Sequence, residues 1–182
     1  MQVWTPRDSG FVVYPDRSGD PALRQAGAGI PHNRSVDPRE PRKPGTPLPF
    51  FVYGTLRPGE ANHDLFLRGR TAAEEPARLL GAVLYEGPGY PFAVEEPGGM
   101  VSGELVTVLP ESYEGLLAEL DRLEEYTPGD PRNLYERVAR DVVRDIGGTV
   151  VRTWVYLAAP RTAARLRAHG TRVEGGDWAR RH

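Results

Sequence analysis

The uneven distribution of proline most constrains how this chain can fold. Nine of its 18 prolines lie within the first 49 residues, where glycine, arginine, aspartate and serine separate short apolar stretches. Such a segment buries too little apolar surface to offset the entropy lost on ordering. We therefore expect residues 1–48 to form an N-terminal arm, with a short edge strand near 11–14. Residues 49–182 are expected to form one folded domain.

Beyond residue 49, strand-like runs alternate with turn signals. Apolar, β-branched and aromatic residues predict strands over 50–53, 78–85, 101–108, 137–143 and 149–157, with a Gly147–Gly148 hairpin turn before the last. Helices are expected near 61–67, over 111–126 and over 160–169. Mixed strands with few helices predict an α+β fold, as a small mixed β-barrel or curved sheet flanked by helices.

The composition excludes several functional classes. The chain has no cysteine, which removes disulfides, thiolate metal sites and a cysteine nucleophile, and fits a reducing cytoplasm. The four histidines are scattered, so we expect no metal. A net charge of −2 gives no electrostatic basis for binding nucleic acid. No apolar stretch is long enough to cross a membrane, and we expect a cytoplasmic protein. The oligomeric state is left open.

A glutamate lies on the apolar face of the predicted helix over 111–126. At about 100° per residue, Glu124 projects roughly 20° from Tyr113. The face that it shares is made of apolar residues at helical spacing: Tyr113, Leu116, Leu117, Leu120 and Leu123. Burial raises the pKa of a carboxyl group toward the range where it can accept and return a proton. A glutamate at a helix end can also reach water or pair with an arginine, and the helix alone does not decide between these roles.

The segment Phe51–Gly59 reads as a strand that ends in a glycine-containing loop. Glycine lets the backbone turn sharply and leaves successive amide groups free to bind an anion such as a carboxylate. An ordinary turn is the alternative. No lysine follows in the manner of a phosphate-binding loop, so nucleotide binding is disfavoured.

Four motifs in order resemble the γ-glutamylcyclotransferase family, in its AIG2-like branch. They are Phe51–Gly59 followed by Asn62, then Leu120–Glu124, Tyr135–Arg137 and Gly176–Trp178. The resemblance spans about residues 50–178 and implies a small β-barrel flanked by helices. It also implies a cofactor-independent reaction on a small molecule. The α-amine of a γ-glutamyl group attacks its own γ-carbonyl, releasing 5-oxoproline and a free amine.

The resemblance further implies roles for individual residues. Glu124 transfers the proton, and the hydroxyl of Tyr135 lines the pocket. The α-carboxylate is held by backbone amides of the first loop, those of Tyr53, Gly54, Thr55 and Leu56. Four further residues are candidates for supporting roles: Arg57, Asn62, Tyr90 and Arg137. Asn62 either orders the loop or caps the short helix, and the two arginines either meet a carboxylate or form surface pairs.

Two features depart from the family pattern. The family often has glycine after the catalytic glutamate, where this chain has Glu125. This change is expected to alter the local turn or to raise the pKa of Glu124 further. A turn-rich insert over 127–133 is expected to form one wall of the pocket.

Several alternatives stay open on the sequence alone. The released amine can be a peptide, a lysine side chain, a small amine or a protected biosynthetic intermediate. A related acyl or amide-forming enzyme on the same scaffold is a second interpretation, and a non-catalytic small-molecule-binding module is a third. The predominance of arginine over lysine resembles the usage of a GC-rich bacterium.

Overall fold

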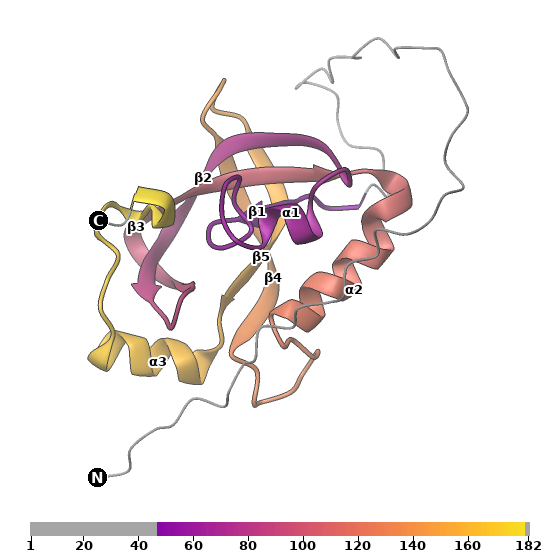
Figure 1. Ribbon diagram of the computed structural model, residues 1–182. Coiled ribbons are helices and arrows are strands. Elements are labelled where there is room, and N and C mark those ends of the chain that lie inside the picture. The colour runs from indigo at the N-terminus through magenta and orange to yellow at the C-terminus, as the bar shows by residue number, and fades with distance from the viewer. Residues whose placement is uncertain (1–46, 181–182) are drawn as a thin grey trace, which may run out of the picture. The chain divides into compact units, whose positions relative to one another are not determined.

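The computed structural model describes residues 47–180 (Figure 1). The expectations for residues 1–46, including the strand near 11–14, lie outside the described residues.

Five strands close into a mixed barrel in the order β1–β3–β2–β4–β5. Their bounds are β1 Phe50–Val52, β2 Thr71–Glu86, β3 Pro91–Val108, β4 Tyr135–Arg144 and β5 Val150–Ala158. Neighbouring strands are antiparallel except at the closure, where β1 runs parallel to β5. The small mixed barrel expected from the sequence is confirmed.

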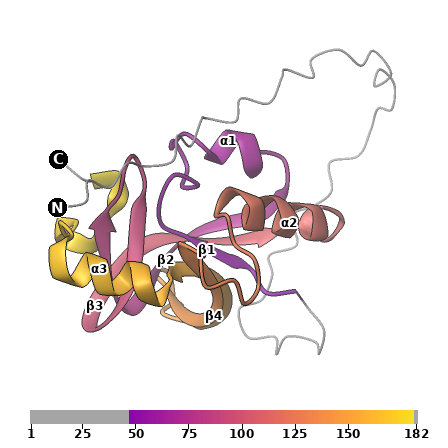
Figure 2. The same ribbon diagram turned by 90° about the horizontal axis from the view of Figure 1, so that it is seen from below.

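Three helices lie outside the barrel: α1 (His63–Phe66), α2 (Tyr113–Leu123) and α3 (Pro160–His169). Figure 2 shows α1 beside α2, with α3 apart from both. Short 3-10 turns precede α2 at Pro110–Ser112 and follow α3 at Glu174–Gly176 and Trp178–Arg180. Helix α2 buries Tyr113, Leu116 and Leu120 in the core, which confirms the apolar face predicted by helical periodicity.

Strands β2 and β3 are longer than the sequence predicts. The expected strands began at residues 78 and 101, whereas β2 begins at Thr71 and β3 at Pro91. The register shifts between Leu80 and Ala82, and Gly81 and Gly98 there have φ angles of 77° and 82°. Glycine adopts these angles without steric cost, so the irregularity bends the strand pair without ending it.

Candidate active site

Helix α2 ends in a turn that normally requires glycine. The amide of Tyr126 donates to the Asp121 carbonyl at 2.8 Å, and the amide of Glu125 donates to the Arg122 carbonyl at 3.2 Å. This is the Schellman pattern, in which the residue after the C-cap takes a left-handed conformation. Glu124 is the C-cap, and Glu125 has a φ of 50°, the only positive φ among the non-glycine residues of 47–180.

The carboxyl group of Glu124 lies deep among protein atoms and has no partner in the described part of the chain. Within residues 47–180 it has no hydrogen bond or ion pair, and the residue keeps a partial opening to solvent. Burial raises the pKa of Glu124 from 4.5 to about 7. Glu125 is not among the causes, so the further rise expected from its charge is absent. The carboxyl group can therefore exist in both protonation states near neutral pH.

Four tyrosines lie within electrostatic range of Glu124, namely Tyr53, Tyr90, Tyr135 and Tyr156. Burial is the main cause that raises the pKa of each hydroxyl, and the charge of Glu124 raises each pKa further. All four hydroxyls consequently stay protonated at neutral pH and are available as hydrogen-bond donors.

Two of these tyrosines are fixed by contacts within the barrel. The Tyr53 hydroxyl donates to the Tyr156 carbonyl at 2.5 Å, and the Tyr135 hydroxyl donates to the Pro91 carbonyl at 2.8 Å. The Tyr90 hydroxyl has no assigned hydrogen bond to the described part of the chain, and its side chain is half-buried. Tyr90 is therefore the member of this group best able to contact a ligand.

A network anchored on Asp121 holds the end of α2 against the barrel. Its Oδ1 atom accepts hydrogen bonds from Arg137 Nε at 2.8 Å and from the Tyr156 hydroxyl at 2.7 Å. The Arg137 guanidinium also lies 4.7 Å from the centre of the Trp154 ring. Because Asp121 belongs to the last turn of α2, these contacts fix the position from which Glu124 projects. Arg137 is thus paired with a protein carboxylate.

The loop after β1 is compact and leaves backbone amides free. Asn62 donates from its backbone amide to the Thr55 carbonyl at 2.9 Å, and from Nδ2 to Thr55 Oγ1 at 3.0 Å. Asn62 makes no side-chain cap to α1, so it orders the loop. The amides of Gly54, Thr55 and Leu56 donate to no assigned acceptor within 47–180. A Cβ on Gly54 would lie 2.9 Å from the Pro91 ring, so only glycine fits this approach.

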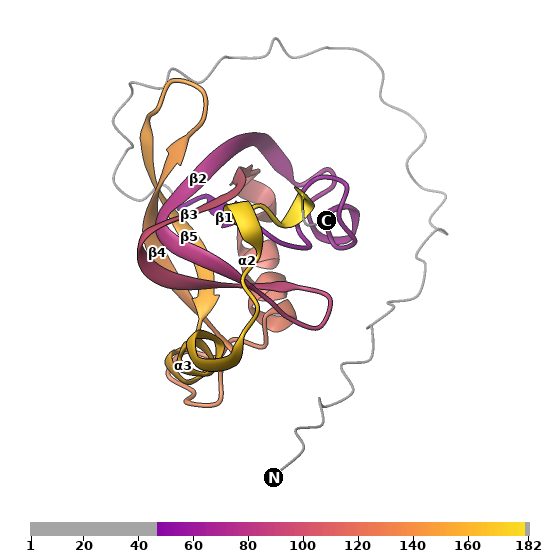
Figure 3. The same cartoon turned by 90° about the vertical axis from the view of Figure 1, so that its left-hand side faces the viewer.

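Arg57 fastens this loop to two distant segments. Its Nε and Nη2 atoms donate to the two carboxylate oxygens of Glu104 on β3, at 2.7 and 3.0 Å. Its Nη1 atom donates to Asp177, within the Gly176–Trp178 motif. Figure 3 shows the C-terminal segment beside the loop that follows β1. The first and last motifs are therefore joined by one guanidinium group, which is already paired on both sides.

The insert over 127–133 is braced by a buried asparagine. Asn133 Nδ2 donates to the Thr127 carbonyl at 2.8 Å, while its Oδ1 accepts from the Thr127 amide at 3.1 Å. The Asn133 amide donates to the Asp130 carbonyl at 3.1 Å. This ordered segment connects Glu124 to Tyr135.

The structure brings together half of the residues selected from the sequence. The Glu124 carboxyl group lies within electrostatic range of Tyr53, Tyr90 and Tyr135. Gly54 lies against the ring of Pro91, and the Pro91 carbonyl accepts the hydrogen bond from Tyr135. Arg57 and Arg137 lie in ion pairs instead. Sequence reasoning missed Tyr156 and the anchoring role of Asp121. The position of Asp121 three residues before Glu124 was the available signal.

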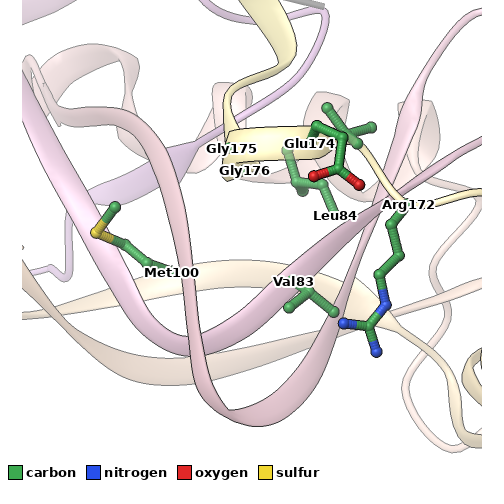
Figure 4. Close-up of a pocket in the computed structure, with 8 residues that line it drawn as sticks. Val83, Leu84, Met100, Arg172, Glu174, Gly175 and Gly176 are labelled. Carbon is green, nitrogen blue, oxygen red and sulfur yellow. The ribbon is translucent and has the colours of Figure 1, made fainter.

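Two cavities lie away from Glu124. The larger, of about 320 Å³, is enclosed by β2, β3 and the C-terminal segment, with Met100 on one side and Arg172 and Glu174 on the other (Figure 4). The second, of about 220 Å³, is lined by residues of β3, β5 and α3. Neither includes the loop after β1. The described residues contain no group of three or more His, Asp or Glu side chains placed to hold a metal ion. No helix among them has the length and apolar character needed to span a membrane.

Among the described residues, the closed mixed barrel carries an unpaired carboxyl group beside protonated tyrosine hydroxyls. This arrangement is typical of a site that transfers protons. The family model described as gamma-glutamyl cyclotransferase, AIG2-like, matches residues 50–180, and the chain belongs to this family. The resemblance drawn from the four motifs is confirmed.

Curated relatives agree with this assignment. The chain is 40% identical over 109 residues to gamma-L-glutamyl-butirosin B gamma-glutamyl cyclotransferase of Niallia circulans, which covers 59% of this chain and 65% of the relative. It is 40% identical over 113 residues to a Halalkalibacterium halodurans protein with a provisional gamma-glutamylcyclotransferase name, covering 62% and 90% of the two chains. A similarly named Vibrio cholerae protein is 33% identical over 131 residues, covering 72% and 95%. The chain thus spans just under two thirds of the first relative's length.

Proposed function

We propose that this protein cleaves γ-glutamyl-amine bonds by intramolecular attack of the substrate's α-amine, releasing 5-oxoproline and the free amine. The observation that carries this proposal is the carboxyl group of Glu124, which is unpaired within 47–180 and has a pKa of about 7. A carboxyl group that only stabilised the fold would have a partner.

The substrate binds through groups that the fold leaves free. Its α-carboxylate accepts hydrogen bonds from the amides of Gly54, Thr55 and Leu56, which have no assigned acceptor within 47–180. The Tyr90 hydroxyl, beside Glu124, contacts the γ-glutamyl chain. The relative from Niallia circulans bears the name of an enzyme acting on a γ-glutamyl compound, which supports γ-glutamyl as the acyl group.

Glu124 then carries two protons, one after the other, between two nitrogens. Its carboxylate accepts a proton from the α-ammonium group, and the resulting amine attacks the γ-carbonyl carbon. A C–N bond forms and the carbonyl oxygen becomes an oxyanion. When the oxyanion re-forms the carbonyl, the original amide C–N bond breaks, and Glu124 returns the proton to the leaving nitrogen. Its carboxylate then accepts the second proton from the ring nitrogen, which leaves the neutral lactam of 5-oxoproline, and passes it to the released amine, which departs as an ammonium ion. The cycle restores the carboxylate and uses only groups of this chain and its substrate.

The expected rate contributions are of ordinary size. A positioned general acid–base contributes about 10²- to 10⁴-fold. Ring closure is intramolecular, so the nucleophile needs no separate binding step.

Glu124→Gln tests the proposal directly. The full-length protein is incubated with a panel of γ-glutamyl amines, and 5-oxoproline and the free amine are quantified by mass spectrometry. The wild type is expected to form both in equal amounts, and Glu124→Gln to lower kcat by about 10²- to 10⁴-fold while the γ-glutamyl ligand still binds.

The matched control is Glu114→Gln. Glu114 is an exposed residue in the first turn of α2, so this variant makes the same charge change far from the proposed site. It is expected to keep wild-type turnover. Wild-type turnover by Glu124→Gln, or no 5-oxoproline from any member of the panel, contradicts the proposal.

A further inference from the structure

Glu125 occupies a strained position in which glycine would fit without cost. Its φ of 50° is the left-handed conformation, which costs an L-residue about 1–2 kcal/mol. Every other residue of 47–180 with a positive φ is a glycine. Backbone strain of this kind is typically retained where a side chain has a functional role.

The Glu125 side chain is also unpaired. It is exposed, and it has no ion pair or hydrogen-bonded side-chain partner in the described part of the chain. Neighbouring acidic residues differ, because Asp121 is paired with Arg137 and Asp130 with Arg132. The carboxylate of Glu125 is therefore an uncompensated negative charge.

This charge lies beside the proposed substrate position. Burial raises the pKa of the Tyr90 hydroxyl most, followed by the charge of Glu125 and then by that of Glu124. Glu125 therefore acts on Tyr90 more strongly than Glu124 does. Arg165 acts on Tyr90 in the opposite direction, more weakly than either glutamate, and has a further interaction of its own.

The proposed reaction places the leaving amine next to this charge. Glu124 must return its proton to the leaving nitrogen, so that nitrogen comes within hydrogen-bond distance of the Glu124 carboxyl group. Glu125 follows Glu124 directly at the exposed end of α2, and the charges of both residues act on the Tyr90 hydroxyl, so the part of the substrate that extends from that nitrogen toward solvent passes close to Glu125.

We infer that Glu125 is a specificity-determining residue, and that the substrates of this protein are γ-glutamyl conjugates of amines that carry a second positive charge. This inference rests on the proposed function. Glu125 attracts the distal cation of the leaving amine and disfavours leaving amines that carry a carboxylate. The charge contact is at the protein surface, where one such contact changes kcat/KM by about five- to tenfold.

The test compares three substrates that differ only in the distal group of the leaving amine. They are the γ-glutamyl conjugates of 1,5-diaminopentane, of pentylamine and of 6-aminohexanoate, whose distal ends are cationic, neutral and anionic. Values of kcat/KM are measured for the wild type, Glu125→Gln and the control Glu114→Gln, at low and at high salt. The wild type is expected to prefer the cationic over the neutral substrate by about five- to tenfold at low salt, and less at high salt.

Glu125→Gln keeps the side-chain shape and the backbone strain but removes the charge. It is expected to reduce the cationic-to-neutral ratio to near one, whereas Glu114→Gln keeps the wild-type ratio. Turnover of all three substrates with no charge preference, or with a preference that Glu125→Gln leaves intact, overturns this inference while the proposed function stands. A wild type that releases 5-oxoproline from none of them overturns both.

Discussion

Two groups of carboxylates in this protein differ in their ion pairing. Around Arg57, the side chains of Glu104 and Asp177 are only 13% and 17% exposed, and both are paired with one guanidinium group. At the end of α2, Glu124 is also largely enclosed, yet within 47–180 it has no ionic partner and its pKa is raised to about 7. Pairing makes the first group a fixed clamp for the loop after β1. The absence of pairing leaves Glu124 able to gain and lose a proton.

Removing the cation from the Arg57 cluster is expected to have the largest effect. Arg57→Ala leaves the mostly buried Glu104 without a counter-charge and leaves Asp177 with only the exposed Arg180, 3.5 Å away, so we expect the free energy of unfolding to fall by about 3–5 kcal/mol. Urea denaturation measures it. Arg68→Ala is the control, because Arg68 and its partner Asp64 are 76% and 61% exposed. That change is expected to stay within about 0.5 kcal/mol. Equal losses in the two variants would show that the cluster does not act as a clamp.

Neutralising Glu124 is expected to have the opposite effect on stability. Its pKa is raised from 4.5 to about 7, so the folded state favours the protonated form. The stability from this group is fully present below pH 4.5 and is lost as the pH rises through about 7. Each tenfold change in the ionisation constant corresponds to about 1.4 kcal/mol, so the free energy of unfolding falls by about 3 kcal/mol.

Glutamine cannot ionise, so Glu124→Gln does not lose this stability as the pH rises. We expect it to be more stable than the wild type by up to about 3 kcal/mol at pH 8, and nearly equal to it at pH 4.5. Urea denaturation at the two pH values measures the difference. A Gln variant less stable than the wild type at pH 8 would contradict the unpaired environment of Glu124.

The same raised pKa predicts a pH dependence of catalysis. The base must be ionised to accept the proton of the α-ammonium group, so kcat/KM is expected to rise with pH and to level off above about 7. At pH 5 it is expected to be roughly one hundredth of its value at pH 8. Initial rates of 5-oxoproline release at low substrate concentration measure this profile. A profile that is flat from pH 5 to 8 would mean that a different group sets the rate.

Relieving the strain at Glu125 is expected to have the smallest effect. Glu125→Gly removes the cost of a left-handed glutamate but adds backbone entropy to the unfolded chain, so we expect a net gain of at most about 1 kcal/mol. Glu125→Gln keeps the strain and serves as the control, with no gain expected. Thermal unfolding of the two variants distinguishes backbone strain from charge. An equal gain in both would assign the effect to charge alone.

Local patterns were sufficient for the features that depend on local sequence. Helical periodicity placed Glu124 beside the leucines of α2, where burial would raise its pKa, and the structure shows that raised pKa. Spacing alone did not decide between burial, exposure to water and pairing with an arginine. The Gly147–Gly148 turn and the proline at the start of α3 were predicted for the same reason. Mixed strands with few helices predicted a small mixed β-barrel or a curved sheet, and the structure is the barrel.

Contacts between distant segments were not predictable in this way. The Tyr156 hydroxyl donates to Asp121, 35 positions away, and Arg57 donates to Asp177, 120 positions away. Periodicity carries no information on such pairs. The strand lengths were wrong for a related reason. Pro97, Gly98 and Gly99 are residue types that favour turns, but Glu95 and Met100 on either side of them pair with β2, so all of them belong to one irregular strand.

The bond between Arg57 and Asp177 means that the loop proposed to hold the substrate is secured by a segment that follows all five strands. Engineering of this protein should respect that dependence. Cleavage between α3 and residue 177, or a fused partner that displaces this segment, would release the loop without altering any residue near Glu124. Such a variant would keep its barrel and its proton carrier while losing affinity for the γ-glutamyl group.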